Sequence, residues 1–310
     1  MLRCCMSSSA APIASLLSRF KRQRPLRAGS LIVTVFGDSI APRGGAVTLR
    51  SLIDLVAPFG LTDRLVRTSV ARLAGDDWLE GRRVGRLGEY RITATGRQRF
   101  ADATRRIYGG PRHDWLGQWT LVLLAGIEGP RRQQLRESLQ WEGFGEPVAG
   151  VLASPTTTPA EAASHLSVEG PGELPLILEA RSPDPRADHR LVTDGWDLTV
   201  LAARYTRFMR QFEPVVAWVR EPPSPADAFA LRTLLIHEYR KIHLRDPLLP
   251  ASLLPRDWPG SAAYDVCRII YERVFLTAED HLSRTAARLD GPLPAPEPAV
   301  YQRFSGLRRH

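Results

Sequence analysis

The chain of 310 residues contains no asparagine, two lysines and three cysteines. Without asparagine it has no acceptor for N-linked glycosylation. Cys4, Cys5 and Cys267 offer neither a disulfide framework nor the spacing of a metal site, which indicates a reducing compartment with Cys267 as a small buried hydrophobe. No stretch of eighteen apolar residues occurs, so we expect no contact with a membrane and predict a cytoplasmic protein, associated with the nucleoid if it binds DNA.

Acidic residues are scarce in the first third of the chain. No Asp or Glu precedes Asp38, and residues 1–110 hold 19 Lys/Arg against 8 Asp/Glu, a net charge of +11. Residues 111–310 hold 23 against 25, a net charge of −2. A GC-rich genome explains the excess of arginine over lysine but not this asymmetry. A surface of this kind attracts nucleic acid because binding releases counter-ions, so we predict that the first third binds a polyanion.

The first 29 residues have no acidic side chain, and their charges follow the apolar part instead of preceding it. That order is wrong for a secretory signal. A mitochondrial presequence and a translation start at Met6 are the alternatives. The interpretation we prefer is a disordered basic arm over residues 1–29.

Residues 30–110 show a regular order of short elements. TLRSLIDLVAPFG and TDRLVRTSVARLAG predict two helices that begin after Thr48 and Thr62, separated by about four residues as a helix-turn-helix requires. WLEGRRVG, RLGE and YRITATG then predict two strands joined by a glycine-marked turn, and TATGRQRFADATRRIYG predicts a third helix. This order indicates a winged helix-turn-helix domain over residues 30–110.

The second of these helices is predicted to have two unlike faces. At 100° per residue, one side collects a set of mostly apolar residues, namely Val66, Ser69, Val70 and Leu73. The opposite side collects residues suited to a major groove, namely Arg64, Arg67, Thr68 and Ala71, with Arg72 flanking. Arginine can chelate the acceptor pair of guanine, and a threonine methyl can meet a thymine methyl.

We therefore predict two groups of DNA-binding residues. The first reads or anchors in the major groove and comprises Arg64, Arg67, Thr68 and Arg72. The second flanks the tip of the strand pair, reaches phosphates or the adjacent minor groove, and comprises Arg82, Arg83 and Arg86. The alternative is a solvated charged face, which is what most surface arginines form. The preceding helix, the strand pair and the charge asymmetry favour DNA binding.

The rest of the chain predicts two further domains and a tail. Strands alternate with helices over residues 111–183, which indicates a small α/β sandwich with Trp115, Trp119 and Trp141 as core anchors. Residues 189–290 predict a helical domain, and the Pro-rich, basic segment 291–310 a loose tail.

Three stretches in this order resemble the PaaX-like family of transcriptional regulators, the repressors of phenylacetic acid degradation. They are LIVTVFGDSIAPRGG, LTDRLVRTSVARLAGDDWL and LIHEYRKIHLRDPLLPASLLPRDWPG. The resemblance, which covers about residues 30–282, implies an α+β protein with a winged helix, a ferredoxin-like central domain and a C-terminal helical domain for effector binding and dimerisation. It also implies a homodimer on operator DNA, released by phenylacetyl-CoA or a related acyl-CoA.

Signals of catalysis are weak. Nucleases of the fold implied for the central domain hold a metal on an acidic residue at the end of the first strand, where this chain has only Glu128 in the following turn. His237 and Glu238 begin like a zinc-protease motif, but its fifth position is Lys241, and His243 lies about 240° around the helix from His237. We predict no catalytic residue, no metal and no cofactor.

The same helix offers a candidate effector site. Cationic side chains for phosphates and a tryptophan for stacking would suit an acyl-CoA, and the predicted residues are His237, Arg240, Lys241, Arg245 and Trp258. A partly buried histidine with a hydrogen bond is the alternative for His237.

The sequence thus predicts a non-enzymatic, DNA-binding repressor of an aromatic-acid catabolic operon that responds to an aryl-acyl-CoA. The alternatives are a metal-dependent nuclease, a sequence-indifferent DNA-binding protein and, more remotely, an acyl-CoA-processing enzyme.

Overall fold

The computed structural model describes residues 11–110, 115–168, 175–221 and 223–307, which form a mixed α+β protein. The chain divides into two compact units. The first comprises residues 1–110, 207–244 and 263–310, and the second comprises residues 111–206 and 245–262. Within the described ranges, no helix has the length and apolar character needed to cross a membrane.

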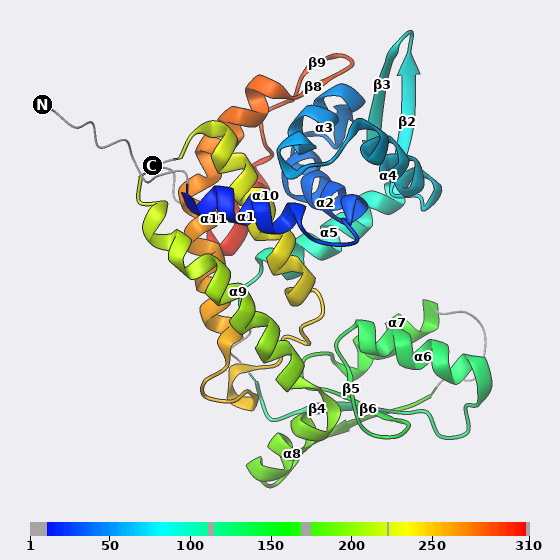
Figure 1. The fold of residues 1–310 in the computed structure, drawn as a ribbon. Coiled ribbons are helices and arrows are strands. Elements are labelled where there is room, and N and C mark those ends of the chain that lie inside the picture. Colours follow the sequence, from blue (N-terminus) through cyan, green and yellow to red (C-terminus); the bar gives the residue numbers. More distant parts are fainter. Residues whose placement is uncertain (1–10, 111–114, 169–174, 222, 308–310) are drawn as a thin grey trace, which may run out of the picture. The chain divides into compact units, whose positions relative to one another are not determined.

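The first unit begins with α1 and continues with the elements of the region predicted to bind DNA, residues 30–110. In chain order they are α1 (Ala11–Lys21), α2 (Ala28–Val35), a π-helical turn (Phe36–Ile40), a 3-10 turn (Ala41–Arg43), β1 (Ala46–Thr48), α3 (Leu49–Val56), α4 (Asp63–Gly75), β2 (Leu79–Val84), β3 (Leu87–Ile92) and α5 (Ala94–Tyr108). β3 lies in the middle of an antiparallel sheet of order β1-β3-β2, and β2 and β3 project as a hairpin (Figure 1).

The helix starts predicted after Thr48 and Thr62 are confirmed, and the third predicted helix, α5, also begins after a threonine, Thr93. The Oγ1 atoms of Thr48, Thr62 and Thr93 accept hydrogen bonds from backbone N–H groups three residues later. Such a cap satisfies one of the N–H groups that the first helical turn leaves without a partner. Gly60, with φ of 79°, reverses the chain between α3 and α4.

The first 29 residues differ from the prediction of a disordered arm. Residues 11–21 form α1, whose Ile13, Leu16 and Phe20 are buried. Phe20 places its ring edge-on against Phe59 and His237, at centroid distances of 6.0 and 5.5 Å. An isolated helix of eleven residues is only marginally stable in water, so packing against the rest of the unit stabilises α1. The charge composition on which the prediction of a disordered arm was based carries no information about this packing. Residues 1–10 lie outside the described part of the chain.

The C-terminal helices, predicted as a domain over residues 189–290, are divided between the two units. They are α9 (Leu198–Trp218), α10 (Pro225–His243) and α11 (Pro259–Thr285). Most of α10 and α11 joins the N-terminal elements in the first unit, where α10 packs against α1, α2 and α5. α10 buries residues on all sides of its axis, which is typical of a helix enclosed by other elements.

The segment predicted as a loose tail is folded as far as Leu307. After α11 come β8 (Ala287–Arg288), β9 (Gly291–Pro292) and a 3-10 segment over Pro298–Ser305. Val300, Phe304 and Leu307 are buried. The many prolines of this segment predicted irregular structure. An irregular segment can nevertheless bury its apolar side chains, as this one does. Residues 308–310 lie outside the described part.

The second unit contains a four-stranded antiparallel sheet of order β5-β6-β4-β7. Its elements are β4 (Trp119–Leu123), α6 (Gly129–Trp141), β5 (Gly145–Val148), β6 (Val151–Ser154), α7 (Pro159–Val168), β7 (Leu176–Ala180) and α8 (Pro185–Gly195). Leu135 and Leu139 of α6 and Leu166 of α7 share a core with Val122 and Leu152.

A second core lies on the other side of this sheet, where Val192 of α8 packs with Trp119 and Ala153. The unit therefore extends beyond the predicted boundary at residue 183. Trp119 is a buried core anchor as predicted, and Trp115 is half-buried with its ring 5.6 Å from that of Trp119. Trp141 is 70% exposed, so its prediction as a core anchor is wrong.

Candidate nucleic-acid interface and its support

Helix α4 has the two faces that the sequence predicts. Val66 and Val70 are fully buried and Leu73 is 9% exposed, while Ser69 is half-buried. The opposite side is exposed and presents Arg64, Arg67, Thr68, Ala71 and Arg72. The buried side packs mainly against α2 and also contacts α3. The fold thus holds α4 by its apolar stripe and leaves the arginine face in solvent.

The arginines of this face are weakly engaged within the chain. Arg72 lies 3.8 Å from a carboxylate oxygen of Asp76, and both side chains are largely exposed. Such a pair contributes little to stability, about 1 kcal/mol or less. The hydroxyl of Thr68 donates to the carbonyl of Arg64 at 2.9 Å, which turns its methyl group outward from that contact.

The β2–β3 hairpin carries the second group of predicted residues. Val84 pairs with Leu87, so the loop is Gly85–Arg86, and Gly85 has φ of 58°. A two-residue hairpin loop favours glycine where φ is positive. Arg82, Arg83 and Arg86 are all exposed. The Arg83 Nε donates to the Gly85 carbonyl at 3.1 Å, which holds one of these cations at the tip.

The base of the hairpin is tied to the C-terminal part of the chain. Glu89 of β3 is 1% exposed, and its carboxylate accepts a hydrogen bond of 2.8 Å from the backbone N–H of Leu289, in the turn between β8 and β9. Arg91 lies 3.5 Å from the same carboxylate. Ser51 of α3 accepts from the backbone N–H of Ala287. These contacts fix the hairpin and α3 against the β8–β9 pair.

Sequence reasoning missed a buried ionic cluster behind this surface. Asp38, in the π-helical turn after α2, is 4% exposed. Its carboxylate forms an ion pair with Arg232, whose Nε lies 2.8 Å away, and accepts a hydrogen bond of 3.0 Å from Arg303 Nη1. The hydroxyls of Tyr108 and Tyr271 donate to the same carboxylate at 2.5 and 2.9 Å. A π turn contains one residue more than the corresponding α-helical turn, and such turns are frequent at functional sites. Here the π turn positions Asp38, the central carboxylate of the cluster.

Opposing effects act on the pKa of Asp38. Burial raises it, but the guanidinium groups of Arg232 and Arg303 and the two tyrosine hydroxyls lower it, and the net shift is downward. Burial and the nearby carboxylate raise the pKa of Tyr108 well above its usual value, so this phenol remains a hydrogen-bond donor. Asp38 is therefore ionised and fully paired in the folded protein.

Glu279 of α11 extends the cluster. It binds Arg232 at 2.6 Å and forms a close ion pair with Arg43, which follows the π turn. Arg43 also donates to the Pro294 carbonyl at 3.0 Å. The cluster thereby connects the start of the chain with α10, α11 and the C-terminal segment. A signal was present in the sequence: Asp38 and Arg232 are single charges within apolar runs, VTVFGDSI and FALRTLLI.

Two of the predicted effector residues lie against α2. The Nδ1 atom of His237 is 3.0 Å from the hydroxyl of Thr34, and Arg240 donates to Thr34 at 2.8 Å and to the Ser30 carbonyl at 2.6 Å. Burial, with Arg240 and Lys241 nearby, holds the pKa of His237 well below its usual value. His237 and Arg240 thus connect α10 to α2, which agrees with the alternative of a hydrogen-bonded histidine.

The other three predicted effector residues are dispersed. Lys241 is exposed and forms an ion pair with Glu238 at 2.8 Å. Arg245 and Trp258 belong to the second unit, where Arg245 is exposed and the ring of Trp258 lies edge-on to Tyr205 at 5.9 Å. Their role in effector binding stays a prediction.

In the described part of the chain, no group of three or more His, Cys, Asp or Glu side chains is arranged to hold a metal ion. Glu128, the one acidic candidate of the central domain, is exposed at the start of α6. Cys267 is fully buried on α11, as predicted.

Comparison with known proteins gives matches along nearly the whole chain. Residues 27–96 match the family described as PaaX-like protein, residues 112–192 the PaaX protein central Cas2-like domain, and residues 196–284 the PaaX-like protein C-terminal domain. The transcriptional repressor PaaX of Escherichia coli (strain K12) is 35% identical over 289 residues, which are 91% of this chain and 92% of that protein.

Among solved structures, an uncharacterized protein, Rv0674 from Mycobacterium tuberculosis, is similar with a TM-score of 0.47 and 23% identity, over 74% of this chain and 91% of that one. The three family matches follow one another in the order of the predicted domains. Together with the identity to the E. coli protein over almost the full length of both, they show that this chain belongs to the PaaX-like family.

Proposed function

We propose that the protein is a transcriptional repressor of an aromatic-acid catabolic operon and that residues 28–108 form a winged helix-turn-helix that binds its operator. The observation that carries the proposal is the exposed face of α4, where three arginines and a threonine surround the small Ala71. α3 and α4 would be the two helices of the motif and β2–β3 the wing. The relative from E. coli is a transcriptional repressor, which agrees with the prediction that this chain is not an enzyme.

Each group of arginines has its own role in this proposal. Arg64, Arg67 and Arg72, with Thr68, enter the major groove, where a bidentate arginine–guanine pair is worth about 1–3 kcal/mol of discrimination. The wing arginines contact phosphates, which adds affinity without sequence preference. A homodimer would place two copies of α4 on half-sites about one helical turn, or a multiple of it, apart.

The four-stranded sheet of the second unit does not by itself assign a catalytic role to the central domain. Its element order, βαββαβ with strand order 4-1-3-2, supports the proposal of a ferredoxin-like fold. Folds of this kind host many unrelated functions, so the fold alone implies no nuclease activity. We propose that this unit serves as a spacer or dimerisation platform.

We further propose that an aryl-acyl-CoA such as phenylacetyl-CoA releases the repressor. A ligand shifts the equilibrium only if it binds the DNA-free arrangement more tightly than the DNA-bound one. The predicted mechanism is therefore a change in the distance or orientation of the two reading helices.

The test is a gel-shift titration with DNA from upstream of the protein's own gene and its neighbours, with scrambled DNA at matched salt. Arg64→Ala/Arg67→Ala should weaken specific binding at least about a hundredfold, because two bidentate contacts are lost, while the melting temperature stays within a few degrees. Arg186→Ala/Arg190→Ala, which changes two exposed arginines of α8, is the matched control and should bind normally.

Other outcomes distinguish the alternatives. Unchanged affinity in the Arg64/Arg67 variant would show that the face of α4 is not the reading surface. Equal affinity for scrambled DNA would indicate a sequence-indifferent DNA-binding protein. Cleavage of the duplex in the presence of Mg²⁺ or Mn²⁺ would indicate a nuclease.

A further inference from the structure

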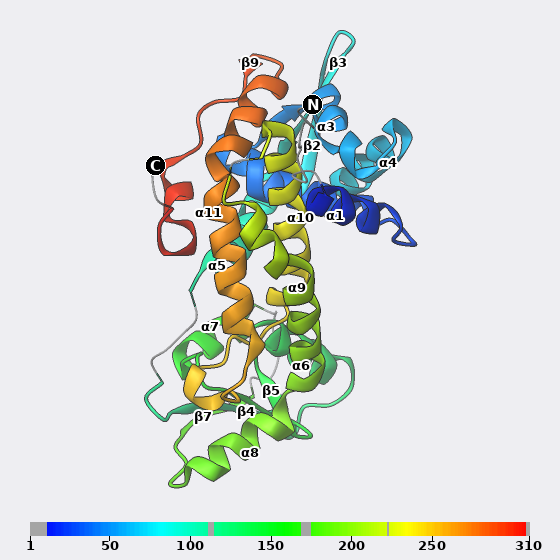
Figure 2. The same cartoon turned by 60° about the vertical axis from the view of Figure 1, so that its left-hand side comes forward.

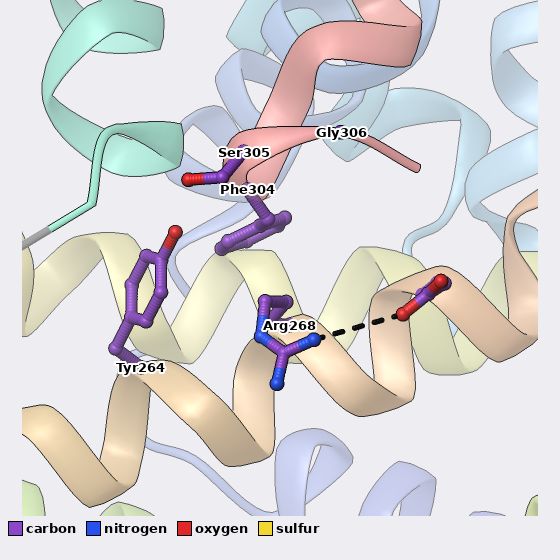
Figure 3. Close-up of a pocket in the computed structure, with 6 residues that line it drawn as sticks. Tyr264, Arg268, Phe304, Ser305 and Gly306 are labelled. Atoms are coloured by element: carbon purple, nitrogen blue, oxygen red, sulfur yellow. Dashed lines mark ion pairs between the residues drawn. The ribbon is translucent and has the colours of Figure 1, made fainter. Parts of the chain in front are cut away.

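A pocket of about 330 Å³ lies in the first unit, between one face of α11 and the C-terminal segment (Figure 3). Tyr264, Arg268 and Glu272 follow one another at intervals of four residues along α11, so they share one side of the helix. The opposite wall is formed by Phe304, Ser305 and Gly306.

The backbone of that wall is strained. Phe304 and Ser305 have φ of 53° and 67°, in the left-handed region that side chains other than glycine rarely adopt. Two successive residues of this kind persist only where surrounding contacts hold them, and such strain is concentrated at ligand clamps and switch regions. Phe304 is held by ring contacts with Tyr108, Tyr264 and Tyr271, at centroid distances of 5.2, 5.5 and 5.2 Å.

The polar side chains of the pocket are the Arg268 guanidinium, the hydroxyls of Tyr264 and Ser305, and the Glu272 carboxylate. Arg268 lies 3.5 Å from Asp265 and 3.8 Å from Glu272, longer than the roughly 2.7–2.9 Å of a charge-assisted hydrogen bond. Its guanidinium therefore has N–H groups available for a closer acceptor. Burial raises the pKa of Tyr264, so its hydroxyl, beside that of Ser305, stays protonated.

The apolar lining is aromatic, with Tyr264 and Phe304 at an interplanar angle of 59°. The volume is at the lower end of the range of ligand pockets, about 300–1,000 Å³. It suits a group of the size of one substituted ring and is too small for a nucleotide. Donors beside aromatic rings fit an aromatic group that carries an acceptor oxygen.

We propose that this pocket binds a small aromatic acyl group, with its oxygen atoms on Arg268 and its ring against Phe304 and Tyr264. The oxygen atoms belong either to a free aromatic carboxylate or to the acyl end of a thioester whose remainder stays outside the pocket. Glu272 lies one turn from Arg268 on the side away from Tyr264, and its carboxylate repels an anion. Asp265 lies next to Tyr264 on the other side of Arg268, 3.5 Å from its guanidinium, and repels an anion in the same way, so the two carboxylates favour the neutral acyl end of a thioester over a free carboxylate. The inference rests on the proposed function, because it assigns a site to the effector.

The pocket is connected to the DNA-binding elements through neighbouring residues. Phe304 follows Arg303, whose guanidinium lies 4.1 Å from the ring centre of Tyr108 and hydrogen-bonds Asp38 at 3.0 Å. Tyr108 ends α5, and Asp38 lies between α2 and β1. Phe304 is 1% exposed, so a ligand ring can reach it only by shifting it. Such a shift would move Arg303 and loosen the contact between the C-terminal segment and the support of α4.

Titration calorimetry on the full-length dimer or monomer, as purified, tests the proposal with three probes: phenylacetate, phenylacetyl-CoA and coenzyme A alone. We expect wild-type protein to bind at least one of the first two and not the third. Arg268→Gln should weaken that binding at least about tenfold, since a hydrogen bond to a charged group is lost. Arg284→Gln is the matched control. Arg284 also pairs with a carboxylate one turn earlier on α11, Asp280 at 2.8 Å, but it does not line the pocket.

Tyr264→Phe keeps the ring and removes the donor, so it should weaken binding less than Arg268→Gln does. Cyclohexylacetate should bind more weakly than phenylacetate if the rings of Phe304 and Tyr264 recognise an aromatic group. Binding of the thioester alone identifies the bound form as a thioester, and binding of both identifies the acyl group itself. No binding of either probe, or binding that Arg268→Gln leaves unchanged, overturns the proposal. Operator binding without ligand, measured on the same samples, tests the proposed function separately.

Discussion

Arginine occurs in two very different settings in the first unit. On α4 and the β2–β3 hairpin, the arginines are exposed and at most loosely paired. In the cluster around Asp38, Arg232 and Arg303 are 0% and 4% exposed, and each binds a carboxylate at 3.0 Å or less. Residues of α5, α10 and α11 contribute to this cluster, and Figure 2 shows these three helices. The same side chain is available to a partner in one region and committed to the fold in the other.

The difference has a physical basis in the cost of removing charge from water. A buried guanidinium is tolerated only where carboxylates and hydrogen bonds replace its hydration. An exposed guanidinium keeps its hydration and exchanges it for phosphate or guanine when DNA arrives. Net charge alone therefore overstates the DNA-binding surface, because part of the positive charge of residues 1–110, such as Arg43, is neutralised inside the protein.

The largest effect is expected where the buried cluster loses its central charge. Asp38→Asn leaves Arg232 and Arg303 buried without their shared carboxylate, and we expect the free energy of unfolding to fall by about 3–5 kcal/mol. Urea denaturation measures this change. Asp54→Asn is the control, since Asp54 and its partner Arg50 are largely exposed, and it should cost about 1 kcal/mol or less. Similar losses in both variants would show that the cluster is not buried as described.

Local features of the fold were predictable from the sequence. The threonine caps of α3, α4 and α5 and the two faces of α4 depend on residues within one or two helical turns, so periodicity and capping preference suffice. The exposed arginines of α4 and the hairpin followed from the same local patterns.

The features that were missed depend on contacts between distant parts of the chain. Arg303 binds Asp38 across 265 positions, and this contact orders the segment predicted as a loose tail. α1 is stabilised by Phe59 and by α10, neither of which is near it in sequence. The pocket beside Arg268 also joins two separate segments. Its wall depends on positive φ angles at Phe304 and Ser305, which cannot be predicted because phenylalanine and serine rarely adopt such angles.

A second, smaller loss of stability is expected on lowering the pH. It arises because the fold buries two histidines, His237 and His243, in their neutral form. Burial lowers the pKa of His243 to about 4, and burial with nearby Arg240 and Lys241 lowers that of His237 well below its usual value of 6.5. The unfolded chain binds protons near pH 6.5, but the folded chain does not until the pH falls much lower. Stability is therefore complete above pH 6.5 and declines below it, by up to about 1.4 kcal/mol per pH unit for each histidine.

Urea denaturation at pH 7.5, 6.5 and 5.5 measures this decline. Within this range, the decline should be steeper between pH 6.5 and 5.5 than between pH 7.5 and 6.5. Asp38 does not contribute in that range, because its lowered pKa confines its effect to more acidic solutions. His243→Gln should reduce the slope by the share of one histidine. Equal stability at pH 6.5 and 5.5 would mean that these histidines are not excluded from protonation in the folded state.

Exchanging arginine for lysine separates the two settings most directly, because the charge is kept, and the smallest effect of all is expected at the wing. At the wing, Arg82→Lys/Arg83→Lys/Arg86→Lys should leave operator affinity within about threefold, since lysine also binds phosphate as a point charge. In the cluster, Arg232 uses three nitrogens at once, toward Asp38, Glu279 and Ser39. A single ammonium cannot reproduce that geometry, so Arg232→Lys should lower the free energy of unfolding by about 1–3 kcal/mol. Gel-shift and urea titrations on both variants measure the contrast. If the wing variant loses sequence specificity, its arginines read bases instead of phosphates; if Arg232→Lys is neutral, charge alone holds the cluster together.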